Sequence, residues 1–184
     1  STEASSEGAA VQTVGPGESI TGVLSRAQPG SEVVVEPGEY REQVTLDNGI
    51  RLVSRVPRGA IIRLPATASD SQPEPAVIAR GSARGELIGF MVAGDARTPL
   101  GVGILVEGAS VALTDVEVSG AAMAAISFAN GSAATLTGSD IHDNPGAALV
   151  IEAGATPRVT HNVFMRNGTS QHIPATFAIE KGAG

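Results

Sequence analysis

The chain has 184 residues, 42% of them hydrophobic, and its 12 Lys and Arg against 19 Asp and Glu give a formal net charge of −7. This acidic balance argues against nucleic acid or an anionic membrane as a partner, and no apolar run approaches the 18 residues of a membrane span. Cysteine is absent, so the fold does not depend on disulfide bonds.

The chain opens on a polar, acidic stretch without the basic start and apolar core of a secretory signal. It reads as a linker, either within a longer protein or at a processed N-terminus. We expect residues 1–14 to hold this linker and a first strand over 11–14. Residues 15–184 are expected to form one domain.

A short helix is predicted over residues 19–28. Ile20, Val23, Leu24 and Ala27 have the i, i+3, i+4, i+7 spacing of one helical face, and a Pro-Gly pair follows. The helix is too short to stand alone, so its apolar stripe has to pack against another element.

The second half of the chain repeats with a period of 23 residues. Four glycines with this spacing are each followed within five residues by an apolar-polar-apolar run: Gly85, Gly108, Gly131 and Gly154. Strand-like segments keep the same offset, so that Leu113, Leu136 and Val159 correspond, as do Ile141 and Phe164. Repeats of this length indicate stacked units that become stable only with neighbours on both sides.

A period of 23 residues, at about 3.3 Å of rise each, makes one turn of a coil whose parallel strands lie about 4.8 Å from those of the next turn. We therefore predict an all-β fold, a right-handed single-stranded parallel β-helix of roughly six to seven coils. The alternative is a β-sandwich, which would not keep distant units in register.

The two ends of such a solenoid need different treatment. Because natural proteins cover open sheet edges, we expect the 19–28 helix to cap the first coil. No amphipathic helix follows the last predicted strand, so that end should be open. A symmetric end-to-end dimer through residues 172–181 is one hypothesis. Pro174, Glu180 and Lys181 favour the alternative of a solitary or differently partnered edge.

Three short motifs carry a family resemblance. Pro37-Gly38-Glu39-Tyr40-Arg41-Glu42 follows an apolar strand, and both Ile141 to Asn144 and Phe164 to Asn167 place an apolar residue three positions before an asparagine. On these motifs, residues 15–180 resemble the pectate-lyase-like superfamily of right-handed parallel β-helices. The resemblance implies the fold. It selects no activity, because the superfamily includes pectate lyases, polygalacturonases, pectin methylesterases, epimerases, phage tailspikes and modules with no known chemistry.

A catalytic site, if present, is expected on the later coils. Acid–base cleavage of a glycosidic bond needs two suitably spaced carboxyl groups. The candidates are Asp140, His142, Asp143, His161 and Arg166. In one register Asp143 stacks on Arg166, which equally predicts a plain cross-coil ion pair.

The motifs of the related enzymes are missing. The Asn-Thr-Asp, Asp-Asp, His-Gly and Arg-x-Lys set of polygalacturonases does not occur. Asp115, Glu117, Asp140 and Asp143 form no obvious cage of oxygen ligands for the calcium of pectate lyases. We therefore expect no catalysis, no metal and no cofactor.

Asn144 and Asn167 also lie 23 residues apart. They predict a ladder in which stacked amides bond neighbouring coils. A sugar-binding role is the alternative for these two side chains. A stacking platform for sugars is not expected, because the chain has no Trp, one Tyr and four Phe.

The arginines suggest a binding site for anions. Arg41, Arg63 and Arg84 are 22 and 21 residues apart and Arg58 and Arg80 are 22 apart, so a regular coil would put them in two columns on one side. Guanidinium groups suit carboxylate, sulfate or phosphate groups. The alternative is a solvated ion-pair lattice with nearby glutamates, namely Glu36, Glu39, Glu42 and Glu86.

Insertions were sought next, because in solenoids they gather on one face and often border the binding groove. One lies over residues 65–75 and another over 94–103, where Asp95 and Arg97 are further candidate ligand-binding residues. Surface drift of no functional consequence is the alternative.

These features together predict a non-catalytic binding or interaction module of an extracytoplasmic protein, taking an acidic polysaccharide, another anion or a protein partner. A polysaccharide lyase or glycoside hydrolase is the first alternative. The second is a sensor domain, since β-helix coils behind a Ser/Glu-rich linker resemble those appended to bacterial membrane proteins such as serine/threonine kinases.

Overall fold

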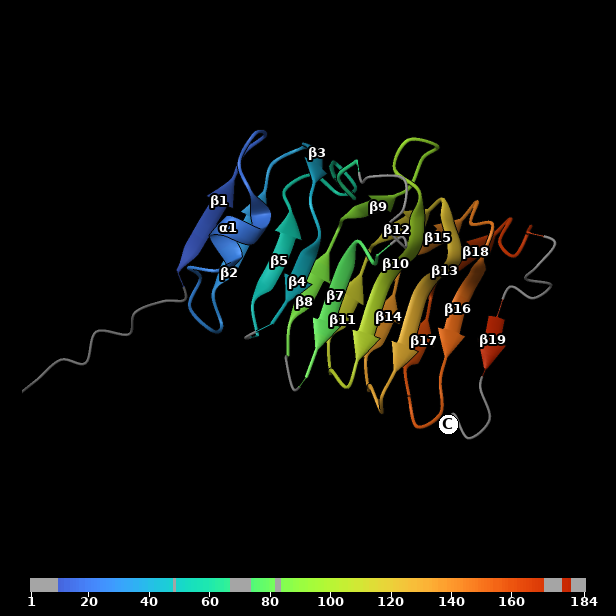
Figure 1. Ribbon diagram of the computed structural model, residues 1–184. Helices are drawn as coiled ribbons and strands as arrows, with labels where there is room; N and C mark the ends of the chain where they lie inside the picture. Colours follow the sequence, from blue (N-terminus) through green and yellow to red (C-terminus); the bar gives the residue numbers. More distant parts are fainter. Residues whose placement is uncertain (1–9, 48, 67–73, 82–83, 171–176, 180–184) are drawn as a thin grey trace, which may run out of the picture.

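A computed structural model describes residues 10–47, 49–66, 74–81 and 84–170, together with the backbone of 177–179. The chain winds as a solenoid whose coils run from the blue to the red end of Figure 1. None of the helices in these residues is long and apolar enough to cross a membrane. The predicted linker over 1–9 and the centre of the 65–75 insertion lie outside the described residues.

Successive coils stack their strands into three parallel sheets, which we call A, B and C. Sheet A contains β1 (Val11–Val14), β2 (Glu32–Val35), β5 (Arg51–Ser54), β8 (Glu86–Ile88), β11 (Ala112–Thr114), β14 (Thr135–Thr137) and β17 (Arg158–Thr160). Sheet B contains β3 (Gly38–Arg41), β6 (Ala60–Arg63), β9 (Met91–Ala93), β12 (Glu117–Ser119), β15 (Asp140–His142) and β18 (Val163–Met165). Sheet C contains β4 (Val44–Leu46), β7 (Val77–Arg80), β10 (Leu100–Glu107), β13 (Ala121–Ala129), β16 (Ala147–Ile151) and β19 (Phe177–Ile179). This arrangement of about six turns confirms the predicted all-β parallel β-helix.

The pairing register follows the 23-residue offset. Leu113 pairs with Leu136, which pairs with Val159, and Ile141 pairs with Phe164. The side chains of Leu113, Leu136 and Ile141 are fully buried. Each coil therefore places apolar residues above those of the coil before it, and the core is one continuous column.

The predicted N-terminal helix is shorter than expected. Helix α1 (Ile20–Leu24) begins at the N-cap Ser19 and stops at Ser25, so the prediction of a helix reaching residue 28 was wrong. Its apolar side chains, Ile20, Val23 and Leu24, are buried in the core beside β1, β2 and β4. Packing rather than helix propensity holds so short a segment.

The Pro-Gly-x-Tyr-x-Glu motif fastens this end of the molecule. Glu42 Oε1 accepts the backbone N–H of Ile20 at 2.6 Å, and its Oε2 accepts that of Thr21 at 3.0 Å. A carboxylate there satisfies the unpaired donors of the first helical turn. Tyr40 Oη donates to the carbonyl of Glu36 at 2.8 Å. In this chain the motif is therefore structural.

The corners between sheets require left-handed backbone. Between sheets A and B this conformation is taken by Arg58, Asp115, Gly138 and His161, and between sheets B and C by Gly120, Asp143 and Arg166. Three of the five candidate catalytic residues are thus corner residues. Asp tolerates this conformation better than most side chains do.

The C-terminal end is staggered. Among the described strands, sheets A and B finish at β17 and β18, whereas β19 adds one more strand to sheet C beside β16. Residues 172–176, 180 and 181 of the hypothetical dimer contact lie outside the described residues, so that hypothesis remains a prediction.

Candidate functional site

Arg41 and Arg63 lie side by side on the outer face of sheet B, in register on β3 and β6. Glu39 lies between them: its Oε1 is 2.6 Å from Arg41 Nη2 and its Oε2 is 3.1 Å from Arg63 Nε. Asp95 Oδ2 is 3.5 Å from Arg63 Nη1. Because two carboxylates neutralise two guanidinium groups, this pair has the ion-pair arrangement that was the alternative to an anion site.

The 94–103 insertion folds onto the same pair. Asp95 Oδ1 accepts the backbone N–H groups of Arg97 and Thr98 at 2.9 and 2.8 Å, and the Thr98 hydroxyl at 2.9 Å. Hydrogen bonds from Thr98, ahead of those from Arg97 and the charge of Arg63, lower the pKa of Asp95. Thr98 is buried and its Oγ1 lies 3.5 Å from Arg41 Nη1. The insertion therefore closes over the arginines.

The predicted arginine columns were wrong beyond this pair. Arg84 lies just before β8 and belongs to the surface of sheet A. Arg58 occupies a corner between β5 and β6, and Arg80 ends β7 in sheet C with its Nε 2.8 Å from Glu107 Oε2. The physical reason is coil length: the pairing of Arg51 with Glu86 shows that this coil holds the 65–75 insertion, so a spacing of 21 or 22 residues no longer marks one turn.

Arg58 instead joins a charged cluster on the surface of sheet B. Its Nη2 is 3.1 Å from Asp115 Oδ1, and its Nη1 is 3.5 Å from Asp140 Oδ2 and 3.7 Å from Glu117 Oε2. Glu117 and Asp140 are register partners on β12 and β15. We call the whole group the sheet B cluster: Arg58, Asp115, Glu117, Asp140, His142, Asp143 and Arg166.

His142 links the two halves of the sheet B cluster. Its Nε2 is 2.9 Å from Glu117 Oε1 and its Nδ1 is 2.7 Å from Asp143 Oδ2. Asp143 in turn binds Arg166, with Oδ1 2.6 Å from Nε and Oδ2 2.8 Å from Nη2. The hydrogen bonds from Arg166, followed by those from His142, hold the pKa of Asp143 well below its usual range, and the same carboxylate raises the pKa of Arg166.

The sheet B cluster gathers four of the five candidate catalytic residues. The fifth, His161, lies at the last corner between β17 and β18, and no hydrogen bond or ion pair of the described residues joins it to the others. Every carboxylate of the cluster is held by a guanidinium or the imidazole, and the described residues contain no group of three or more side chains arranged to hold a metal ion. Such a network neutralises charge between coils.

The asparagines are fully used by the backbone. Asn144 is buried, its Nδ2 lies 2.8 Å from Asn167 Oδ1, and its Oδ1 accepts the N–H of Ala121 at 3.0 Å. A second ladder, not predicted, joins Ser139 to Asn162, whose Oδ1 accepts the Ser139 N–H at 2.8 Å. Its 23-residue offset was the available signal. Both ladders tie coil to coil and leave little bonding capacity for a sugar.

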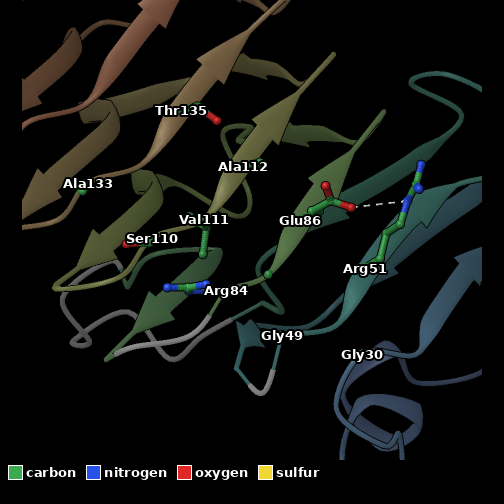
Figure 2. Close-up of a pocket in the computed structure, with 11 residues that line it drawn as sticks. Gly30, Gly49, Arg51, Arg84, Glu86, Ser110, Val111, Ala112, Ala133 and Thr135 are labelled. Carbon is green, nitrogen blue, oxygen red and sulfur yellow. Dashed lines mark ion pairs between the residues drawn. The ribbon is translucent and has the colours of Figure 1, made fainter. Parts of the chain in front are cut away.

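A groove on sheet A is the remaining candidate. It has a volume of about 480 Å³ and is lined by Gly30, Gly49, Arg51, Arg84, Gly85, Glu86, Ser110, Val111, Ala112, Ala133 and Thr135. We call it the sheet A groove. Figure 2 shows Arg51 and Glu86 facing each other on one side, with Arg51 Nε 3.4 Å from Glu86 Oε2, and Arg84 extending beside Val111 on the other.

Arg84 differs from the other candidate arginines. It is exposed, and no carboxylate among the described residues lies within ion-pair distance of it. Small residues on the neighbouring coils keep the floor beside it low, and backbone bonds fix that floor: Ala112 N–H donates to Gly85 O at 3.0 Å. The sequence indicated Arg84 as a candidate, but the 21-residue spacing assigned it to the wrong face.

The family model described as "Right handed beta helix region" matches residues 98–179. The chain is a right-handed parallel β-helix repeat domain. No curated protein and no solved structure matches it. The family match covers the later coils, where the sheet B cluster and one end of the sheet A groove lie, so it supports the fold of the β-helix domain and leaves its activity open.

The sheet B cluster makes the stability of the β-helix domain depend on pH through His142. Burial lowers the pKa of His142, but hydrogen bonds to Asp143 and Glu117 and the charges around it outweigh burial, so the folded pKa is raised above 6.5. The protonated imidazole therefore stabilises the folded state fully below about pH 6.5, and this contribution is lost as pH rises through the raised folded pKa.

We expect His142→Gln to narrow this pH dependence. In urea unfolding at several pH values between about 5.5 and 9, the stability advantage of the parent domain over the variant should be largest at the acid end. His161→Gln is the matched control, since His161 takes no part in the network. An advantage that grows toward alkaline pH would contradict the assignment.

Proposed function

We propose that this β-helix domain is a non-catalytic binding module and that its ligand is an acidic polysaccharide held in the sheet A groove. The observation that supports this is the guanidinium of Arg84, which stands exposed in a groove without a carboxylate partner among the described residues. A guanidinium binds a carboxylate through two parallel hydrogen bonds, so an unpaired one in a groove is suited to a uronate group.

The other arginines proposed for this role have partners of their own. Arg41 and Arg63 share Glu39, Arg58 lies among Asp115, Glu117 and Asp140, and Arg80 binds Glu107. An incoming anion would have to displace a carboxylate at each of these places. At Arg84 it would displace only water.

The lining of the sheet A groove favours binding over cleavage. Hydrolysis of a glycosidic bond needs two carboxyl groups flanking the sugar. Among the described lining residues Glu86 is the single carboxylate, and Arg51 already binds it at 3.4 Å. Polysaccharides of this class lie outside the cytoplasm, so the proposal includes an extracytoplasmic location.

Binding to oligomers of galacturonic acid tests the proposal. Arg84→Ala should weaken the affinity, measured by titration calorimetry, by about tenfold or more, corresponding to the loss of one charge-assisted contact. Arg80→Ala, an exposed arginine with its own carboxylate on sheet C, should leave the affinity unchanged. Methyl-esterified oligomers should bind worse than the free acids. Equal affinity of the parent domain and Arg84→Ala would contradict the site.

The same oligomers test the absence of catalysis. Incubation of polygalacturonate, alginate or xylan with the domain, with and without calcium, should produce neither new reducing ends nor 4,5-unsaturated products. Turnover that disappears in Asp140→Asn or Asp143→Asn would overturn the proposal in favour of an enzyme acting at the sheet B cluster.

A further inference from the structure

A second exposed arginine lies in line with the sheet A groove. The outward residues of sheet A form one row across the strands, in which Glu86 pairs with Ala112, Ala112 with Thr135, and Thr135 with Arg158. Ala112 and Thr135 line the groove, so Arg158 on β17 continues the same surface. Arg158 is exposed, and no carboxylate among the described residues lies within ion-pair distance of it.

Arg84 and Arg158 therefore stand at opposite ends of one surface. Arg84 comes two residues before β8, and three strand steps separate β8 from β17. With strands about 4.8 Å apart, the two backbones are about 14 Å or more from each other. Both side chains are long enough to lean along the groove, so the span between the two charges adjusts to a ligand.

The surface between the two arginines is suited to a chain of sugars. The residues that line it there are Ser110, Val111, Ala112, Ala133 and Thr135. They offer two hydroxyls and shallow apolar contact, and none of them carries a negative charge that would repel a polyanion. A polymer lying here would run along the solenoid axis, across the strands.

We propose that Arg84 and Arg158 form a two-point clamp for a single acidic oligosaccharide of several uronate residues, with one carboxylate bound near each end of the sheet A groove. This inference rests on the proposed function and adds the ligand's length and direction. Binding at the second arginine becomes intramolecular once the first is engaged, so the affinity of a spanning oligomer exceeds that of a short one.

The charge of the whole domain makes the second contact necessary. A formal net charge of −7 repels a polyanion at long range, so a single exposed guanidinium gives weak binding. Two guanidinium groups acting on one ligand offset this repulsion locally. The length of the oligomer should therefore decide affinity more than its concentration of carboxylates does.

The test compares a digalacturonate with a hexagalacturonate on four proteins: the parent domain, Arg84→Ala, Arg158→Ala and the double variant. The parent should bind the longer oligomer at least about tenfold more tightly at equal carboxylate concentration. Arg158→Ala should remove most of this length advantage and leave affinity for the short oligomer nearly unchanged. Arg80→Ala should keep the advantage. Both clamp residues are exposed, so unchanged melting temperatures serve as the folding check.

The failures of the two proposals can be told apart. If Arg84→Ala weakens binding but Arg158→Ala keeps the full length advantage, the clamp is overturned and the binding site at Arg84 remains. If the parent binds neither oligomer, the proposed function falls and the clamp with it. A non-additive effect of the double variant on the long oligomer alone would support the clamp.

Discussion

Replacing Gly120 by Ala should lower the free energy of unfolding by about 3 kcal/mol, one of the two largest effects we expect from a single substitution. Gly120 has φ +78° at the corner between sheets B and C, where a side chain is strained. A Cβ built there would lie 2.5 Å from the carbonyl oxygen of Gly94 on the preceding coil. Since that neighbour is backbone, the two coils would have to move apart.

Gly138→Ala is the matched control. Gly138 has φ +63°, also in the left-handed region, but a Cβ there would meet no atom within 4 Å. Its substitution should cost only the backbone strain, about 1 kcal/mol. Urea unfolding of the two variants separates strain from steric contact. Equal losses would show that close stacking at Gly120 contributes nothing.

Replacing Asn144 by Ala should cost about 3 to 4 kcal/mol. Asn144 is fully buried; its Oδ1 accepts the Ala121 N–H at 3.0 Å, and its Nδ2 lies 3.0 Å from Val118 O and 2.8 Å from Asn167 Oδ1. Alanine would leave a buried N–H and buried carbonyl groups without partners. Unsatisfied groups of this kind are more costly than a lost surface hydrogen bond.

Asn162→Ala on the second ladder provides the comparison. Asn162 is partly exposed, accepting from Ser139 N–H at 2.8 Å and donating to Leu136 O at 2.9 Å. Water can replace these bonds in part, so we expect a loss of about 1 to 2 kcal/mol in thermal or urea unfolding. Asn144→Asp should be nearly as damaging as Asn144→Ala, because a carboxylate keeps the bond to Ala121 but faces three oxygens. A tolerated Asn144→Asp would contradict this account.

The sequence predicted the fold well where the coils are uniform. From Gly85 onward the 23-residue offset gave the register of Leu113, Leu136 and Val159, because each position must repeat its packing on the next coil. Before Gly85 the coil that pairs Arg51 with Glu86 contains an insertion. Arithmetic on residue numbers therefore failed there, and with it the assignment of Arg84 to the face of Arg41.

The candidate sites could be predicted only in part. The stacking of Asp143 on Arg166 followed from the period, but the contact of Arg58 with Asp140 joins residues 82 apart on non-adjacent coils. No local pattern marks such a contact. Glu42 was recognised as part of a motif, yet its partner is the helix start 22 residues earlier, and capping depends on how the chain returns. Arg158 had the right offset from Thr135, but an offset does not reveal whether a cation has a partner.

The two ends of the solenoid differ in how tightly they are closed, and this gives the molecule a direction. At the first coil α1 and Glu42 hold buried side chains and backbone donors, whereas at the other end β17 and β18 each have one described neighbour in their sheets. A stack of repeats loses coils from whichever end has the weaker interface. Unravelling should therefore start at the last coil and travel toward the cap, so Arg158 belongs to the part of the domain that opens first, and Arg84 to a part that opens later.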